Sequence, residues 1–284
     1  MPKHTINHNG STTAYWSYHD EAQPVIVMVH GFRGTHHGLA RIVEKLPNCR
    51  IIVPDLPGFG ASEPLTTTHT LDAYVAFLQD FIAQLQLDQP PILLGHSFGS
   101  IIASHYAAKH PQTIDKLILV NPIAAPALKG PKAAMTQLAI FYYWLGRKLP
   151  AKASHAWLSA SPIVKIMSIT MAKTNDKQTL NFIHQQHLTH FSSFANPTVV
   201  AEAFQTSVSH DVRQVANRIT TPTLLIAGER DDITALPKQK ELAEHISGAT
   251  LVVIPNVGHL IHYETPDAAA QAVTNFVSTP TKLA

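Results

Sequence analysis

Residues 92–103 read Ile92-Leu93-Leu94-Gly95-His96-Ser97-Phe98-Gly99-Ser100-Ile101-Ile102-Ala103. An apolar run, a short turn with serine at its apex and a second apolar pattern predict a strand, a sharp turn and a helix in direct succession. Gly95 and Gly99 lack the Cβ atoms that would collide where the chain doubles back. Serine on such a strained turn is typical of a nucleophile, so Ser97 is the candidate nucleophile.

Two later strand ends supply the groups that a serine nucleophile needs. A serine hydroxyl is a weak nucleophile near neutral pH, so it requires a base that takes its proton and a third group that orients the base. The apolar run 223–227 is followed by Asp231 and Asp232, and the run 251–254 is followed by His259. The residues alone leave both aspartates as candidates for the orienting carboxylate.

Short apolar runs recur along the chain and end in loops. Their continuous hydrophobicity predicts strands buried on both faces, at 25–29, 51–53, 92–94, 117–120, 223–227 and 251–254. Helical patterns lie between them, the clearest at 71–85, and an opening hairpin is predicted around Asn9-Gly10. We therefore expect an α/β fold with a mostly parallel sheet of about eight strands and helices on both sides.

Four motifs coincide in this framework and together resemble the α/β-hydrolase fold superfamily. Their chain order of serine, acid and histidine is also the order of that family. The resemblance covers essentially the whole chain outside residues 122–205, and its motifs are His30-Gly31-Phe32, the stretch Asp55-Leu56-Pro57-Gly58-Phe59-Gly60-Ala61-Ser62, the serine turn, and the acid and histidine loops.

The resemblance implies a role for each matching residue. Ser97 would be the nucleophile, and His259 would act first as general base and then as general acid. The family pattern places the acid at the third residue after the glycine that closes the preceding strand, which selects Asp231 as the orienting carboxylate. The backbone N–H groups of Phe32 and Phe98 would form the oxyanion hole.

The alternation of predicted strands and helices is interrupted between residues 122 and 205. This segment reads as several helices interrupted by prolines, and it looks like the helical cap that the family inserts after its fourth parallel strand. We therefore expect three parts: residues 1–121 as the first part of the hydrolase core, 122–205 as the cap, and 206–284 as the second part of the core.

Basic and acidic residues are unevenly distributed along the chain, although its net charge is small. The 284 residues contain 21 Lys and Arg against 19 Asp and Glu, and a net charge of +2 argues against nucleic-acid binding. However, residues 116–175 contain eight basic residues, no acidic residue and several aromatic ones. The rest of the chain therefore has a net charge of −6. Two interpretations stay open: a solvated outer face over packed aromatics, or a basic lid that binds an apolar acyl chain or an anionic surface.

Other classes of site and location have little support in the sequence. His184, His187 and His190 recur at a spacing of three without an accompanying carboxylate or cysteine, so we expect a polar cap helix and no metal. No nicotinamide, flavin or phosphate-loop signature is present, and we expect no cofactor. The longest strongly apolar stretch, 138–145, is far shorter than the roughly 20 residues of a membrane span. With no signal-peptide pattern, we expect a cytoplasmic protein without a transmembrane segment.

These observations favour a serine hydrolase that cleaves small-molecule carboxylic esters through an acyl-enzyme intermediate. The same triad would also serve a carbon–carbon bond hydrolase, an acyltransferase or a perhydrolase. An alternative of another class is a ligand-binding or signalling protein that keeps the hydrolase fold and turns over little substrate.

Overall fold

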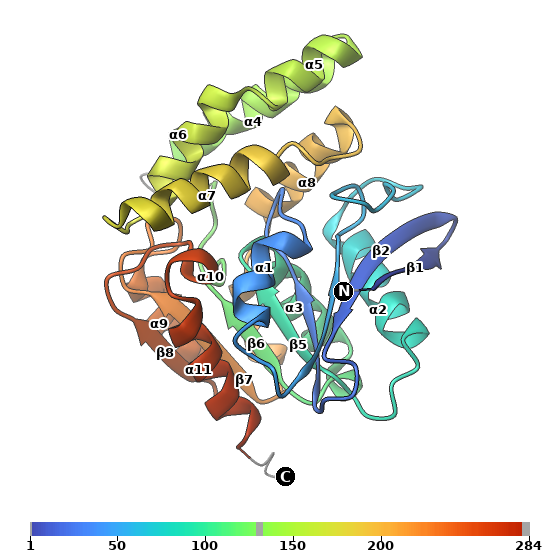
Figure 1. Ribbon diagram of the computed structural model, residues 1–284, viewed down its shortest axis with the longest axis vertical. Helices are drawn as coiled ribbons and strands as arrows, with labels where there is room; N and C mark the ends of the chain where they lie inside the picture. The colour runs from blue at the N-terminus through green and yellow to red at the C-terminus, as the bar shows by residue number, and fades with distance from the viewer. Residues whose placement is uncertain (1, 129–132, 280–284) are drawn as a thin grey trace.

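An eight-stranded sheet forms the centre of the protein (Figure 1). The computed structural model describes residues 2–128 and 133–279. The strand order is β1-β2-β4-β3-β5-β6-β7-β8, in which β1 and β2 are antiparallel to their neighbours and the others run parallel. The strands are β1 (Lys3–His8), β2 (Ser11–Tyr18), β3 (Val25–Val29), β4 (Arg50–Pro54), β5 (Ile92–His96), β6 (Leu117–Val120), β7 (Thr223–Gly228) and β8 (Thr250–Ile254).

The expected α/β fold is confirmed strand by strand. Every apolar run singled out in the sequence lies in one of the six parallel strands, and all residues of β3, β5, β6 and β7 are buried. The opening hairpin turns at Asn9 and Gly10, whose φ angles are 48° and 84°. Positive φ at both central residues is what a two-residue hairpin turn requires, so this dipeptide suits the turn.

Helices cover both faces of the sheet and enclose two apolar cores. On one face lie α1 (His36–Val43) and α11 (Pro266–Val277), with the short α10 (Ile261–Glu264) beside them. The other face is covered by α2 (Leu71–Gln84), α3 (Phe98–Lys109) and α9 (Leu236–His245). Short 3₁₀ turns lie at Pro111–Thr113, Val212–Gln214 and Ala216–Arg218.

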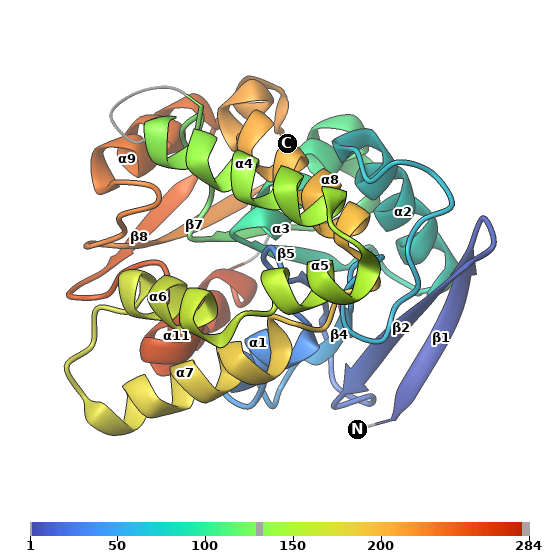
Figure 2. The same ribbon diagram turned by 90° about the horizontal axis from the view of Figure 1, so that it is seen from above.

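In the part of the chain that the structure describes, five helices between β6 and β7 lie above the edge of the sheet at which the parallel strands end (Figure 2). They are α4 (Ala133–Lys148), α5 (Ala151–Leu158), α6 (Ser161–Met171), α7 (Lys177–His190) and α8 (Pro197–Ser209). We call them the upper helices. The boundary expected at residue 205 falls inside α8, which continues to Ser209. None of the helices in the described ranges has the length and apolar character needed to cross a bilayer.

A buried arginine connects the upper helices to the sheet. Arg33 follows β3 with a φ of 57°, and its side chain is 1% exposed. Its Nε donates to the carbonyl of Phe191 at the end of α7, and its Nη2 donates to that of Leu158 at the end of α5, both at 2.8 Å. Helix C-termini carry partial negative charge, which favours a cation at this position. Arg33 therefore fastens two upper helices to the loop after β3.

Replacing Arg33 by methionine should destabilise the fold. Arg33→Met keeps an unbranched chain but leaves the carbonyls of Leu158 and Phe191 without their donors, at a cost of about 1–3 kcal/mol for each buried group. Urea unfolding of parent and variant measures the difference in unfolding free energy. The exposed Arg218→Met is the matched control and should stay within about 0.5 kcal/mol of the parent. Equal effects of the two variants would contradict this role of Arg33.

Candidate active site

Ser97 lies on the sharp turn between β5 and α3 that the sequence predicts. Its φ and ψ angles are 52° and −116°, a conformation that few L-residues adopt. A Cβ at Gly95 would lie 2.4 Å from the carbonyl oxygen of Gly99, and one at Gly99 would lie 2.3 Å from that of Val29. Only glycine fits at both positions, so α3 can start directly against β3 and β5.

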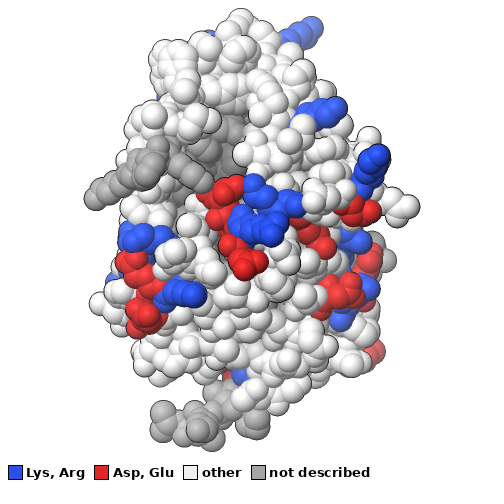
Figure 3. Space-filling model, turned by 90° about the vertical axis from the view of Figure 1, so that its left-hand side faces the viewer, with Lys and Arg blue, Asp and Glu red and all other residues white. Residues whose placement is uncertain are grey.

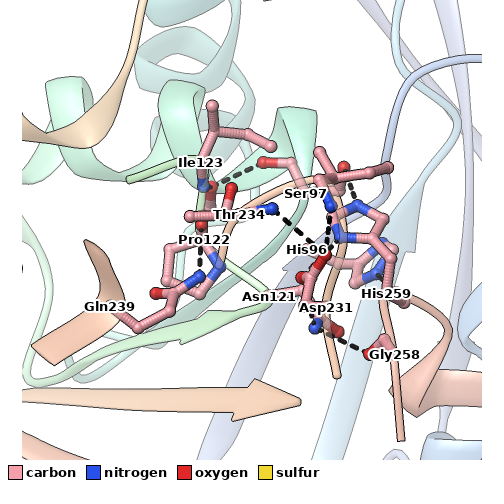
Figure 4. A network of polar contacts seen from close by, with 12 residues as sticks. His96, Ser97, Asn121, Pro122, Ile123, Asp231, Thr234, Gln239, Gly258 and His259 are labelled. Carbon is pink, nitrogen blue, oxygen red and sulfur yellow. Dashed lines mark hydrogen bonds and ion pairs between the residues drawn. The ribbon is translucent and has the colours of Figure 1, made fainter. Parts of the chain in front are cut away.

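His259 joins the hydroxyl of Ser97 to a carboxylate (Figure 4). Its Nδ1 lies 2.8 Å from Oδ2 of Asp231, and its Nε2 lies 2.8 Å from Oγ of Ser97. A carboxylate can only accept, so the proton is on Nδ1 and Nε2 accepts from the serine hydroxyl. The structure thus brings together the three predicted side chains from the ends of β5, β7 and β8, which lie far apart in the sequence.

Asp231 is buried and held by four donors. Its Oδ1 accepts from the amides of Ile233 and Thr234, and its Oδ2 accepts from His259 and from Asn121. Burial alone raises the pKa of Asp231, but the charge and hydrogen bond of His259 and the two amides outweigh it. The pKa of Asp231 therefore lies below its ordinary value, and the group is a carboxylate at neutral pH.

Asp232, the other candidate from the sequence, points elsewhere. Its side chain is 60% exposed and pairs with Lys173, which follows α6. The choice between two adjacent aspartates thus comes down to which one faces His259, and the geometry favours Asp231.

Asn121 is a site residue that the sequence reasoning missed. It directly follows β6, is fully buried and has a φ of 45°. Its Nδ2 donates to Oδ2 of Asp231 at 3.0 Å and to the carbonyl of Gly258 at 3.2 Å (Figure 4). One amide therefore links the acid loop to the residue before His259. Its place just beyond a parallel strand was the available signal, because ligands and reacting groups gather at that edge.

The predicted oxyanion-hole residues lie beside Ser97. A Cβ at Gly31 would be 3.3 Å from the Cβ of Ser97, so the loop that carries Phe32 is in contact with the nucleophile turn. Phe98 is the first residue of α3, where amides have no intrahelical acceptor. His30 accepts from the amide of Leu56 through Nε2 and donates through Nδ1 to the carbonyl of Gly31, so it connects the loop after β3 to the loop after β4.

A chain of buried histidines extends from the site toward the upper helices. His96 lies 5.7 Å from His259 and 4.1 Å from His262, measured between ring centroids. His187, on α7, packs on Tyr263 beside His262. Burial, together with neighbouring histidine charge, lowers the pKa of His96 and of His187 to about 3 and also lowers that of His262. These rings are therefore neutral at pH 7.

The three spaced histidines of α7 do not converge on a common point. His187 is buried, His184 contacts the hydroxyl of Ser168 through its Nδ1, and His190 stacks on His37. Within residues 2–128 and 133–279, no group of His, Cys, Asp and Glu side chains is arranged to hold a metal ion. The polar helix expected here is in fact partly buried, since α7 packs against α6 and α10.

Acid should destabilise the protein through these histidines. His96 and His187 stay neutral in the folded state down to a pH of about 3, whereas the unfolded chain protonates them near 6.5. Between these values the unfolded state binds more protons, so the free energy of unfolding falls as the pH falls. Each histidine contributes about 1.4 kcal/mol per pH unit. His187→Leu should therefore flatten the pH dependence in urea unfolding measured between pH 7 and pH 4.

A second variant separates this effect from the general loss of a histidine. His4 is exposed on β1, and His4→Leu serves as the matched control. If His187→Leu and the parent lost stability in parallel as the pH fell, the buried neutral state of His187 would be refuted.

The family model described as alpha/beta hydrolase fold matches residues 24–266 of this chain. The chain belongs to the α/β hydrolase fold family, and it is an α/β-hydrolase. The resemblance drawn from the serine turn and its accompanying motifs is confirmed.

Several similar proteins are named as lipases or esterases. A monoacylglycerol lipase of Xenopus laevis is 25% identical over 90% of this chain and 76% of its own length. The pimeloyl-[acyl-carrier protein] methyl ester esterase of Neisseria meningitidis is 25% identical over 90% of this chain and 94% of its own. The structure of a thermophilic esterase from Thermogutta terrifontis has a TM-score of 0.79 and 24% identity, covering 98% of this chain and all of that one.

Proposed function

We propose that the protein is a serine hydrolase that cleaves carboxylic esters through a covalent acyl-enzyme intermediate. The observation that carries the proposal is the pair of 2.8 Å contacts that places His259 between Ser97 and Asp231. This arrangement can deprotonate a serine hydroxyl and return the proton to a leaving group. The lipases and esterases among the relatives support the same class of substrate.

The mechanism follows from the proton positions. Nε2 of His259 takes the proton as Oγ of Ser97 attacks the ester carbonyl, and Asp231 stabilises the resulting imidazolium. His259 then protonates the departing alcohol, which leaves the acyl group on Ser97. A water molecule gives a proton to the same Nε2 and attacks the acyl-enzyme. His259 then returns this proton to Oγ of Ser97 as the bond to the acyl group breaks and the acid product leaves. No cofactor takes part in these steps.

The amides of Phe32 and Phe98 are proposed to bind the oxyanion. Both belong to segments in contact with Ser97: the loop after β3 and the first turn of α3. Donors fixed in this way lower the barrier without reorganising as charge develops, and one such donor is worth about 3 kcal/mol.

The upper helices are proposed to form the cap that the sequence predicts at residues 122–205, extended to the end of α8 at Ser209, over an apolar part of the substrate. Phe32 contacts Tyr143 of α4 and Phe204 of α8, with ring centroids 5.7 Å and 5.5 Å apart. Tyr143 and Phe204 also line a surface cavity between α4, α8 and residues 68–70, together with Ile140 and Trp144. An apolar acyl chain placed along these rings would lead to the oxyanion-hole loop. A cytoplasmic location stays a prediction.

Turnover of a graded ester panel tests the proposal. Nitrophenyl esters of increasing acyl length should be hydrolysed by the parent, with a preference for medium acyl chains over acetate because aromatic rings line part of the cavity. Ser97→Ala should lower kcat by about 10⁴-fold or more. Ser104→Ala, which removes a buried hydroxyl from the same helix, is the matched control and should keep its activity.

Two outcomes of the panel would count against the proposal. Comparable turnover by the parent and by Ser97→Ala would remove Ser97 from the mechanism. Negligible turnover by the parent on every ester would favour a carbon–carbon bond hydrolase, an acyltransferase, a perhydrolase or a ligand-binding protein on the same fold.

Asn121 should act on this reaction as a positioning residue. Asn121→Ala removes one donor from Asp231 and the link to the carbonyl of Gly258. We expect kcat to fall about ten-fold or more, because a hydrogen bond to a charged group is worth about 1.5–3 kcal/mol. KM should change little, since Asn121 does not face the substrate.

A neighbouring amide provides the control for this experiment. Gln239 donates to the carbonyl of Pro122, is also fully buried and does not contact the triad (Figure 4). Gln239→Ala should lower the melting temperature and leave kcat near the parent value. An unchanged kcat in Asn121→Ala would show that the amide only packs the loop.

A further inference from the structure

Large apolar side chains are exposed on the first three upper helices, where packing against the core would be expected to hide them. Their exposure ranges from 37% for Trp157 to 70% for Met135. In the described ranges, one other large apolar side chain is similarly exposed, Ile233. We call the set on α4, α5 and α6 the apolar helical surface; it consists of Met135, Leu138, Phe141, Trp144, Trp157, Ile166 and Ile169.

The charges on these three helices are all of one sign. Arg147, Lys148, Lys152 and Lys165 are exposed, and the sequence of α4, α5 and α6 contains no acidic residue. The upper part of Figure 3 accordingly shows basic groups among uncharged side chains and no acidic ones. Nζ of Lys148 lies 6.0 Å from the ring centroid of Trp144, so a basic and an aromatic group occupy the same part of α4. Lys129 and Lys132 of the basic segment lie outside the described residues.

These features distinguish between kinds of partner. An exposed apolar patch mixed with basic residues marks an interaction site. A second copy of this chain would bring one positively charged surface against another, which is unfavourable. An anionic bilayer satisfies both features, because its phosphates attract Lys and Arg while its interfacial region accepts Trp, Phe, Leu and Ile.

We propose that the apolar helical surface docks onto the surface of an anionic phospholipid bilayer. Leu138 and Phe141 enter the boundary between headgroups and acyl chains, and Lys148 and Lys165 contact lipid phosphates. The upper helices lie over the edge of the sheet that carries Ser97, so docking turns this edge toward the lipid (Figures 1 and 2). The docking depends on the surface alone and not on the chemistry of Ser97.

Vesicle binding tests the docking without hydrolysis of lipid. All proteins carry Ser97→Ala, and co-sedimentation is measured with vesicles of phosphatidylcholine alone and of phosphatidylcholine mixed with phosphatidylglycerol. The protein should bind the mixed vesicles, bind pure phosphatidylcholine much less, and lose affinity as NaCl rises because salt screens the attraction. Because the background is inactive by design, failure of the ester assay and failure of docking are independent results.

Paired variants assign the binding to the apolar helical surface. Lys148→Gln and Lys165→Gln should each weaken binding to the mixed vesicles about five-fold, the value expected for one basic residue near an anionic surface. Lys109→Gln and Lys240→Gln, on α3 and α9, are the charge-matched controls and should bind as the parent does. Leu138→Ser combined with Phe141→Ser should reduce binding at least as strongly, whereas Ile233→Ser should not.

Circular dichroism melting of each variant confirms that it is folded before binding is compared. The proposal is overturned by any of three results. These are no binding to mixed vesicles at low salt, equal binding to pure phosphatidylcholine, or equal losses in the variants and their controls. A dimer in sedimentation velocity that disappears with Phe141→Ser would also overturn it, because the second copy would then cover the surface.

Discussion

The close approach of α3 to strands β3 and β5 is the constraint on which the rest of the site depends. The backbone of Gly99 lies so near the carbonyl of Val29 that no side chain fits between them. Ser97 is therefore held at the apex of a turn that the helix and the two strands fix from three sides. Because Ser97, the proposed nucleophile, directly follows strand β5 and does not lie on a free loop, the other groups need only be brought to one fixed point.

Asp231 and His259 are carried by two loops whose positions are coupled by hydrogen bonds. Asn121 holds the acid loop and the residue before His259 with one amide, and the amides of Ile233 and Thr234 hold the other oxygen of Asp231. Burial raises the pKa of Asp231, but the charge and hydrogen bond of His259 and the two amides outweigh it, so this pKa lies below its ordinary value. The resulting carboxylate fixes the tautomer of His259, which decides the direction in which a proton can move.

The upper helices are attached by a few polar contacts and many aromatic ones. Arg33 reaches from the loop after β3 to the ends of α5 and α7, next to the residue whose amide is proposed to bind the oxyanion. The rings of Phe32, Tyr143 and Phe204 connect the same loop to α4 and α8. Movement of the upper helices would therefore displace the loop that is proposed to bind the oxyanion, while their outer side remains available to a partner.

The sequence by itself determined the sheet, the nucleophile turn and the chain order of serine, acid and histidine. Local signals carry these features: continuous apolar runs, Gly95 and Gly99, and polar residues just beyond strands. The residues alone left Asp231 and Asp232 open, and the family pattern selected Asp231. The physical reason came only from the tertiary structure, because it depends on which side chain faces a residue 28 positions away. The tertiary structure also decided the roles of Asn121 and Arg33 and the exposure of the α4 aromatics. Each of these features depends on contacts, or the absence of contacts, with residues far away in the sequence, so no pattern within one segment predicts them.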